Sequence, residues 1–202
     1  MMFKNKLSII FVLLASLFLA ACEQKAPEFK QLLVYPKKNP LPEFKLSHHS
    51  GSEFSKQSFQ GKWNLIFIGY THCPDVCPLT LTEIDKIYSA IPADMQSKFQ
   101  VVLFSVDPKR DTPAHLAEYV SHFNDDFVGI TGEKPEIDKL VKALGGIYAI
   151  NNEDPEYYSV DHSGRIFIVN PQGERFGIIS SEAMHNKDKS PIVEELKLLP
   201  SI

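Results

Sequence analysis

Hydrophobic residues in this chain fall into short, nearly continuous runs that alternate with stretches of helical spacing. The runs cover residues 65–68, 101–106 and 127–130 and are typical of buried strands. Each run is followed by a segment whose apolar residues recur every two to four positions, close to the period of an amphipathic helix. This threefold strand–helix order predicts an α/β domain with a mainly parallel sheet flanked by helices.

Two hairpins extend this predicted sheet. Residues 43–46 alternate between polar and apolar types, and a turn over residues 47–52 leads to Phe54, which predicts an N-terminal hairpin at the domain edge. Near the C-terminus, strands over residues 165–169 and 175–179 flank the turn signal Asn170–Gly173. We therefore expect a central mixed sheet with an N-terminal hairpin and a C-terminal β-hairpin.

The first 21 residues have the composition of an export signal. Lys4 and Lys6 precede an apolar stretch without acidic residues, which is typical of a signal peptide. The stretch ends at Cys22 in a segment that looks like a bacterial lipobox, in which the cysteine is lipidated and becomes the N-terminus. An ordinary export signal and an uncleaved anchor are the alternatives. We expect a membrane-anchored lipoprotein on the periplasmic side of the cell envelope.

Proline-rich residues 22–41 predict a tether that holds a domain over residues 42–202 away from the membrane. The full chain of 202 residues carries a net charge of −4, so nothing indicates a nucleic-acid partner. Of its three cysteines, Cys22 is assigned to lipid, which leaves Cys73 and Cys77 for each other or for a metal. In an oxidising compartment two free thiols tend to oxidise unless they are protected.

Cys73 and Cys77 lie in the predicted turn between the first buried strand and its helix. Backbone N–H groups and the helix dipole favour anions there, so the pKa of at least one thiol should be lowered. Their separation by about one helical turn would place the Cα atoms roughly 6 Å apart. That distance suits a disulfide and also two sulfurs on one metal. A purely structural disulfide is disfavoured because so small a loop removes little unfolded-state entropy.

Three segments carry distinctive motifs: GYTHCPDVCP at Gly69–Pro78, SVDPKRDTP at Ser105–Pro113 and VDHS at Val160–Ser163. Together these motifs resemble the SCO/SenC family, the copper-delivery proteins of cytochrome oxidase assembly. The resemblance spans about residues 40–199 and implies a thioredoxin-like fold. Ordinary thioredoxins place two residues between their cysteines, whereas three lie between Cys73 and Cys77.

The resemblance implies that Cys73, Cys77 and His162 bind one copper ion. Thiolates favour Cu(I), while imidazole suits both Cu(I) and Cu(II). Three donors also leave a site that can release its ion, unlike a closed four-ligand site. We expect Asp161 or a nearby backbone carbonyl to orient His162, and we give His72 a similar supporting role.

The resulting hypothesis is a copper chaperone, not an enzyme, which loads the dinuclear copper site of cytochrome c oxidase or another exported copper protein. It could also reduce the cysteines of the acceptor. The alternative is a thiol-disulfide oxidoreductase or peroxide-defence protein of the cell envelope, which needs the cysteines and not His162.

Other chemically capable residues receive less weight. We expect His48 and His49 to be solvated loop residues, and Met184 and His185 to lie in an exposed loop. His115 and His122 lie on one face of a predicted helix and are interpreted as surface residues. A further pair, Asp107 and Arg110, should order the loop after the second buried strand.

Overall fold

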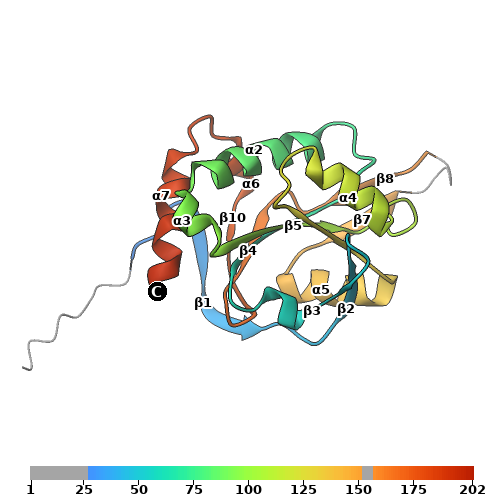
Figure 1. The fold of residues 1–202 in the computed structure, drawn as a ribbon, viewed down its shortest axis with the longest axis horizontal. Coiled ribbons are helices and arrows are strands. Elements are labelled where there is room, and N and C mark those ends of the chain that lie inside the picture. Colours follow the sequence, from blue (N-terminus) through green and yellow to red (C-terminus); the bar gives the residue numbers. More distant parts are fainter. Residues whose placement is uncertain (1–26, 152–156) are drawn as a thin grey trace, which may run out of the picture.

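An eight-stranded mixed sheet forms the centre of the domain (Figure 1). The structure is a computed structural model and describes residues 27–151 and 157–202. In spatial order the strands are β1 (Leu32–Pro40), β10 (Glu174–Ile179), β9 (Ile166–Val169), β4 (Trp63–Gly69), β5 (Phe99–Ser105), β6 (Val128–Thr131), β2 (Lys45–His48) and β3 (Glu53–Ser55). Strands β4, β5 and β6 are parallel and the other neighbours are antiparallel. Both predicted hairpins, β2–β3 and β9–β10, are confirmed.

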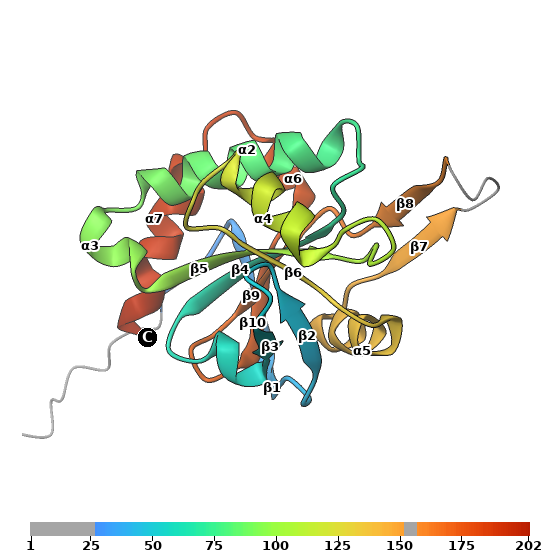
Figure 2. The same cartoon turned by 45° about the vertical axis from the view of Figure 1, so that its right-hand side comes forward.

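Helices cover both faces of the sheet. Figure 2 shows α2 (Val76–Ala90), α3 (Ala93–Gln96), α4 (Pro113–Ser121) and α7 (Ser190–Leu198) on one side and α5 (Lys134–Leu144) on the other. The short elements are η1 (Lys56–Phe59), α6 (Ser181–His185) and η2 (Leu199–Ser201). Helices α2 and α4 share a face because each joins neighbouring parallel strands by a crossover of the same hand.

Strand β4 is buried along its whole length, which explains its unbroken apolar run. Its one polar side chain, Asn64, is fully buried and donates to the carbonyl groups of Phe59 and Lys62, at 2.8 Å each. The buried amide is thereby satisfied and anchors the start of the strand. The cysteine turn follows directly from the other end of β4.

Two short strands form a ribbon apart from the main sheet. Strands β7 (Tyr148–Asn151) and β8 (Ser159–His162) pair in antiparallel register and project beyond the sheet (Figures 1 and 2). At the base of the ribbon, the Ser163 N–H donates to the Ile147 carbonyl at 3.1 Å. The Ile147 N–H in turn donates to Ser163 Oγ at 3.0 Å. These bonds close the base of the ribbon, and β8 also contacts β4.

The predicted tether over residues 22–41 is wrong for Leu32–Pro40, which form β1 and pair with β10. Leu32 is buried, and the Glu195 carboxylate accepts hydrogen bonds from the N–H groups of residues 30–32. The prolines misled the prediction because an edge strand tolerates them where its N–H groups face away from the sheet. The register of β1 also shifts between Val34 and Asn39.

The predicted export signal over residues 1–21 and the lipidation site Cys22 lie outside the described residues. Within residues 27–151 and 157–202, no helix combines the length and apolar character needed to span a bilayer. The membrane anchor therefore stays a prediction.

Candidate metal centre

The two motif cysteines come from the turn after β4 and the first turn of α2. Cys77 is completely buried, whereas Cys73 is half-buried. Both thiols are free, and the Cys77 backbone N–H points at Cys73 Sγ, 3.4 Å away. Winding the chain into a helix at Val76 thus aims a backbone donor at the first sulfur.

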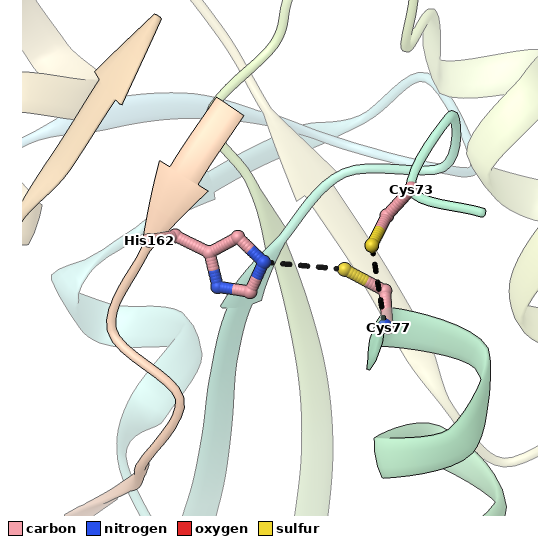
Figure 3. Close-up of side chains that lie close together, drawn as sticks. All are labelled: Cys73, Cys77 and His162. Carbon is pink, nitrogen blue, oxygen red and sulfur yellow. Dashed lines mark hydrogen bonds between the residues drawn. The ribbon is translucent and has the colours of Figure 1, made fainter. Parts of the chain in front are cut away.

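His162 completes the cluster from the end of β8. Its Nε2 atom lies 3.3 Å from Cys77 Sγ, and Figure 3 shows the imidazole facing the two sulfurs. One ligand atom from each of Cys73, Cys77 and His162 lies within 4.8 Å of the other two. Two cysteines of one turn and a histidine 85 residues beyond Cys77 therefore converge on one point.

The two thiols differ in their acidity. Burial by itself would raise the pKa of the Cys73 thiol, but hydrogen bonds from the N–H groups of Asp75, Cys77 and Val76 lower it below its ordinary value. Burial raises the pKa of Cys77 far above its ordinary value, and its hydrogen bond with Cys73 raises it further. The predicted acidic thiol is therefore Cys73, the more accessible of the two.

Aromatic rings enclose the histidine. The rings of Phe67 and Tyr70 meet the His162 imidazole edge-on, with centroid distances of 5.6 Å and 6.1 Å. Burial lowers the pKa of His162, although the Ser163 carbonyl and the Asp161 charge oppose this shift. The imidazole is thus kept in the neutral form that can act as a ligand.

Of the two groups predicted to orient His162, the structure uses the backbone carbonyl. His162 Nδ1 lies 3.4 Å from the Ser163 oxygen. The Asp161 carboxylate instead accepts a hydrogen bond from Asn151 Nδ2 at 2.8 Å, across the β7–β8 ribbon. The alternation of side chains along a strand explains this, because Asp161 and His162 point to opposite faces of β8.

A glycine makes room for the buried sulfur. A Cβ atom added at Gly69 would lie 3.2 Å from Cys77 Sγ and 3.1 Å from Phe67 Cε1. Any larger residue here would press on the sulfur and on the ring that flanks His162. Gly69 thus allows the end of β4 to approach the first turn of α2 closely.

Asp107 and Arg110 order more than their own loop. The Tyr158 hydroxyl donates to Asp107 Oδ1 at 2.6 Å, and the Arg110 guanidinium stacks 3.6 Å from the centre of the Tyr158 ring. Arg110 also donates to the Tyr158 carbonyl oxygen at 3.1 Å. The loop after β5 therefore holds the segment that leads into β8, and with it the position of His162.

A family model described as SCO1/SenC matches residues 35–197. The chain belongs to the SCO1/SenC family. It is 36% identical over 148 residues to a Stutzerimonas stutzeri protein predicted to bind copper, covering 73% of this chain and 72% of that protein. It is also 36% identical to the human mitochondrial SCO1 homologue over 65% of this chain, which spans only 44% of the human protein.

Solved structures confirm the thioredoxin-like fold. Copper-bound ScoI from Bradyrhizobium japonicum superposes with a TM-score of 0.70 at 31% identity, covering 79% of this chain and 99% of that one. BsSco, described with a disulfide switch and as a member of the Sco family of cytochrome c oxidase assembly proteins, has a TM-score of 0.63. At 20% identity, covering 85% of this chain and 99% of that one, BsSco shows likeness of fold alone.

His72 of this SCO1/SenC protein turns away from the cysteines. Its Nδ1 lies 3.1 Å from Thr71 Oγ1 and 3.7 Å from Asp111 Oδ1. His115 Nε2 lies 2.9 Å from the same Thr71 oxygen. The interpretation of His115 as a surface residue missed this cluster, although Asp111 just before the N-cap Thr112 and His115 in the first turn of α4 were a usable signal.

The remaining candidates lie apart from both clusters. His122 is exposed, and its Nδ1 lies 2.6 Å from the Glu118 carbonyl oxygen. His49 Nδ1 accepts from the Gly129 N–H at 3.1 Å, so it ties the β2–β3 turn to β6. The exposed loop predicted around Met184 is wrong, because this residue is buried within α6 and packs against the core.

Proposed function

We propose that this protein is a copper chaperone that carries one copper ion on Cys73, Cys77 and His162. The observation that supports the proposal is the convergence of the two Sγ atoms and one imidazole nitrogen within 4.8 Å of one another. A copper-bound relative of the same fold and family agrees with this assignment. Copper is cargo here and not a resident cofactor.

The donor set suits both common oxidation states of copper. Two thiolates are soft ligands that favour Cu(I), and a neutral imidazole also accepts Cu(II). Binding must displace a proton from Cys77, whose thiol burial keeps protonated. Cys73 is half-buried, so the cluster has an accessible side from which an acceptor can take the ion.

The acceptor that we propose is the dinuclear copper site of cytochrome c oxidase, since the chain belongs to the SCO1/SenC family, whose resemblance implies copper delivery in oxidase assembly. We further propose that the protein works on the periplasmic side, anchored by lipid on Cys22. Labelling with a radioactive fatty acid tests the anchor. The wild-type protein should take up the label and Cys22→Ala should not. Equal labelling of the wild type and the variant would refute the lipid anchor.

A second candidate function is thiol-disulfide exchange. The unequal thiols favour it, because Cys73 is accessible with a lowered pKa, as an attacking thiol requires, and Cys77 is buried behind it. The two functions are compatible, since a reduced pair could first reduce the acceptor's cysteines and then deliver copper.

His162 separates the two functions. In cells that carry only His162→Ala and grow at limiting copper, we expect most oxidase activity in the membranes to be lost and added copper to restore part of it. The matched control is His122→Ala, which changes an exposed histidine and should leave oxidase activity intact. Full oxidase activity in His162→Ala, together with its loss in Cys73→Ala, would support the exchange function instead.

A further inference from the structure

We propose that His72, Asp111 and His115 form a second metal site, which takes a divalent cation of the Cu(II) or Zn(II) class. One ligand atom from each residue lies within 4.8 Å of the other two. The three residues come from the turn after β4, the loop after β5 and the first turn of α4. This inference uses none of the three residues assigned to the copper cargo, so it does not depend on the proposed function.

The hydroxyl of Thr71 marks the point on which the three ligands converge. Thr71 Oγ1 lies 2.6 Å from Asp111 Oδ1, 2.9 Å from His115 Nε2 and 3.1 Å from His72 Nδ1. A hydroxyl has one proton and two lone pairs, so it can donate to the carboxylate and accept from both imidazoles. Each ligand thus already aims a donor atom at the same small region.

A metal ion fits this arrangement after a small contraction. Zinc–nitrogen and zinc–oxygen bonds are about 2.0–2.2 Å long, so each ligand would move inward by roughly 1 Å or less. Rotation of the Thr71 side chain about its Cα–Cβ bond removes the hydroxyl from the centre. His72 and His115 are side chains on the surface side of the cluster, and 47% of the His72 side chain is exposed, which leaves room for this adjustment and for an ion to enter.

The charge at this cluster also favours a cation. Asp111 is completely buried, and its hydrogen-bond donors are neutral: the Thr71 N–H at 2.9 Å, the Thr71 hydroxyl at 2.6 Å and the Ser105 hydroxyl at 2.6 Å. The adjacent cation, Arg110, is paired with Asp107. A buried carboxylate is costly without a compensating positive charge, which a bound metal ion supplies.

The donor set selects the class of metal. Two imidazoles and one carboxylate suit Cu(II), Zn(II) and similar divalent ions, whereas Cu(I) favours the thiolates of Cys73 and Cys77. The two clusters therefore divide the metals between them by ligand softness. Both are reached from the same turn, since Thr71 and His72 directly precede Cys73.

The test is a Cu(II) titration of the full chain in detergent, with the cargo ligands removed as Cys73→Ser/Cys77→Ser/His162→Ala. We expect one bound Cu(II) ion whose electron paramagnetic resonance spectrum shows coupling to two nitrogens. Adding His115→Ala should weaken binding at least about tenfold, since even changes outside the ligand shell cost 10–100-fold. Adding His122→Ala, a histidine on the opposite end of the same helix, should change neither the affinity nor the spectrum.

If the triple variant does not fold, the same titration uses His162→Ala with Cys73 and Cys77 oxidised to a disulfide. The proposal is overturned if no Cu(II) binds above the level of denatured protein, or if His115→Ala leaves the affinity and nitrogen coupling unchanged. It is also overturned if His122→Ala weakens binding as much as His115→Ala. Failure of this site would leave oxidase assembly and Cu(I) binding by wild-type protein unaffected, so it is distinguishable from failure of the proposed function.

Discussion

One turn of the chain, residues 69–78, contributes to two clusters of opposite chemical character. Cys73 and Cys77 meet His162 beside the rings of Phe67 and Tyr70, where burial keeps the thiol of Cys77 protonated. On the other side, Thr71 and His72 meet a buried carboxylate in a network of hydrogen bonds. To take up an ion, the soft cluster must lose the proton of a buried thiol, whereas the hard cluster is already joined by hydrogen bonds and also anchors the turn. The difference shows that one turn can present soft ligands on one side and harder ligands, held by the fold, on the other.

The largest expected effect is loss of Cu(I) from the soft cluster alone. Cys77→Ser should weaken Cu(I) binding by more than about a hundredfold, because a soft ligand is lost and not merely its surroundings. Competition with a chromogenic Cu(I) chelator measures this affinity. The Cu(II) titration of the second cluster should be unchanged in the same variant, and a parallel loss there would show that the clusters are not independent.

The next effect is on stability. Asp111→Ala should lower the free energy of unfolding by about 3 kcal/mol, because it leaves several buried donors without an acceptor, each at roughly 1–3 kcal/mol. Urea unfolding of the reduced protein measures it. The control Asp125→Ala removes an exposed carboxylate and should cost under about 0.5 kcal/mol. Equal stabilities of the two variants would mean that Asp111 does not anchor the turn.

Within the soft cluster, the thiols should differ in reactivity by about tenfold or more. Cys73 has a lowered pKa and is accessible, whereas Cys77 has a raised pKa and is buried, and each pKa unit changes the thiolate fraction about tenfold below the pKa. Alkylation of the reduced protein with iodoacetamide at neutral pH, read by mass spectrometry of peptides, compares them. Faster labelling of Cys77 would contradict the assignment of the acidic thiol.

The smallest effect is on the pH dependence of stability. Burial lowers the pKa of His162, so below the unfolded value of about 6.5 the unfolded state binds the proton more readily than the folded state. The stability of the metal-free protein should therefore fall as the pH drops below about 6.5, by at most about 1.4 kcal/mol per pH unit from this group. Urea unfolding across this range should show a shallower fall in His162→Ala. If the free energy of unfolding fell equally steeply with pH in both proteins, His162 would not contribute to this pH dependence.

Much of this protein is determined by local patterns in its sequence. Buried parallel strands need unbroken apolar runs, and Thr112 before Pro113 sets the start of α4, where the Thr112 oxygen accepts from the His115 N–H at 3.2 Å. The sequence also places two cysteines at the start of a helix, and this placement predicts the lowered pKa of one thiol. The segment with His162 was identified by resemblance to a family and not by its local pattern.

The tertiary structure alone decided which distant groups meet. Residues 32–40 are a strand because β10 and Glu195 provide partners, which no local signal in a proline-containing segment reveals. Asp161 and His72 are each adjacent in sequence to a proposed copper ligand, yet they turn to Asn151 and Thr71 because successive side chains point in different directions. His115 joins Asp111 and His72 only because α4 and the cysteine turn follow neighbouring parallel strands, which brings both segments to the same edge of the sheet.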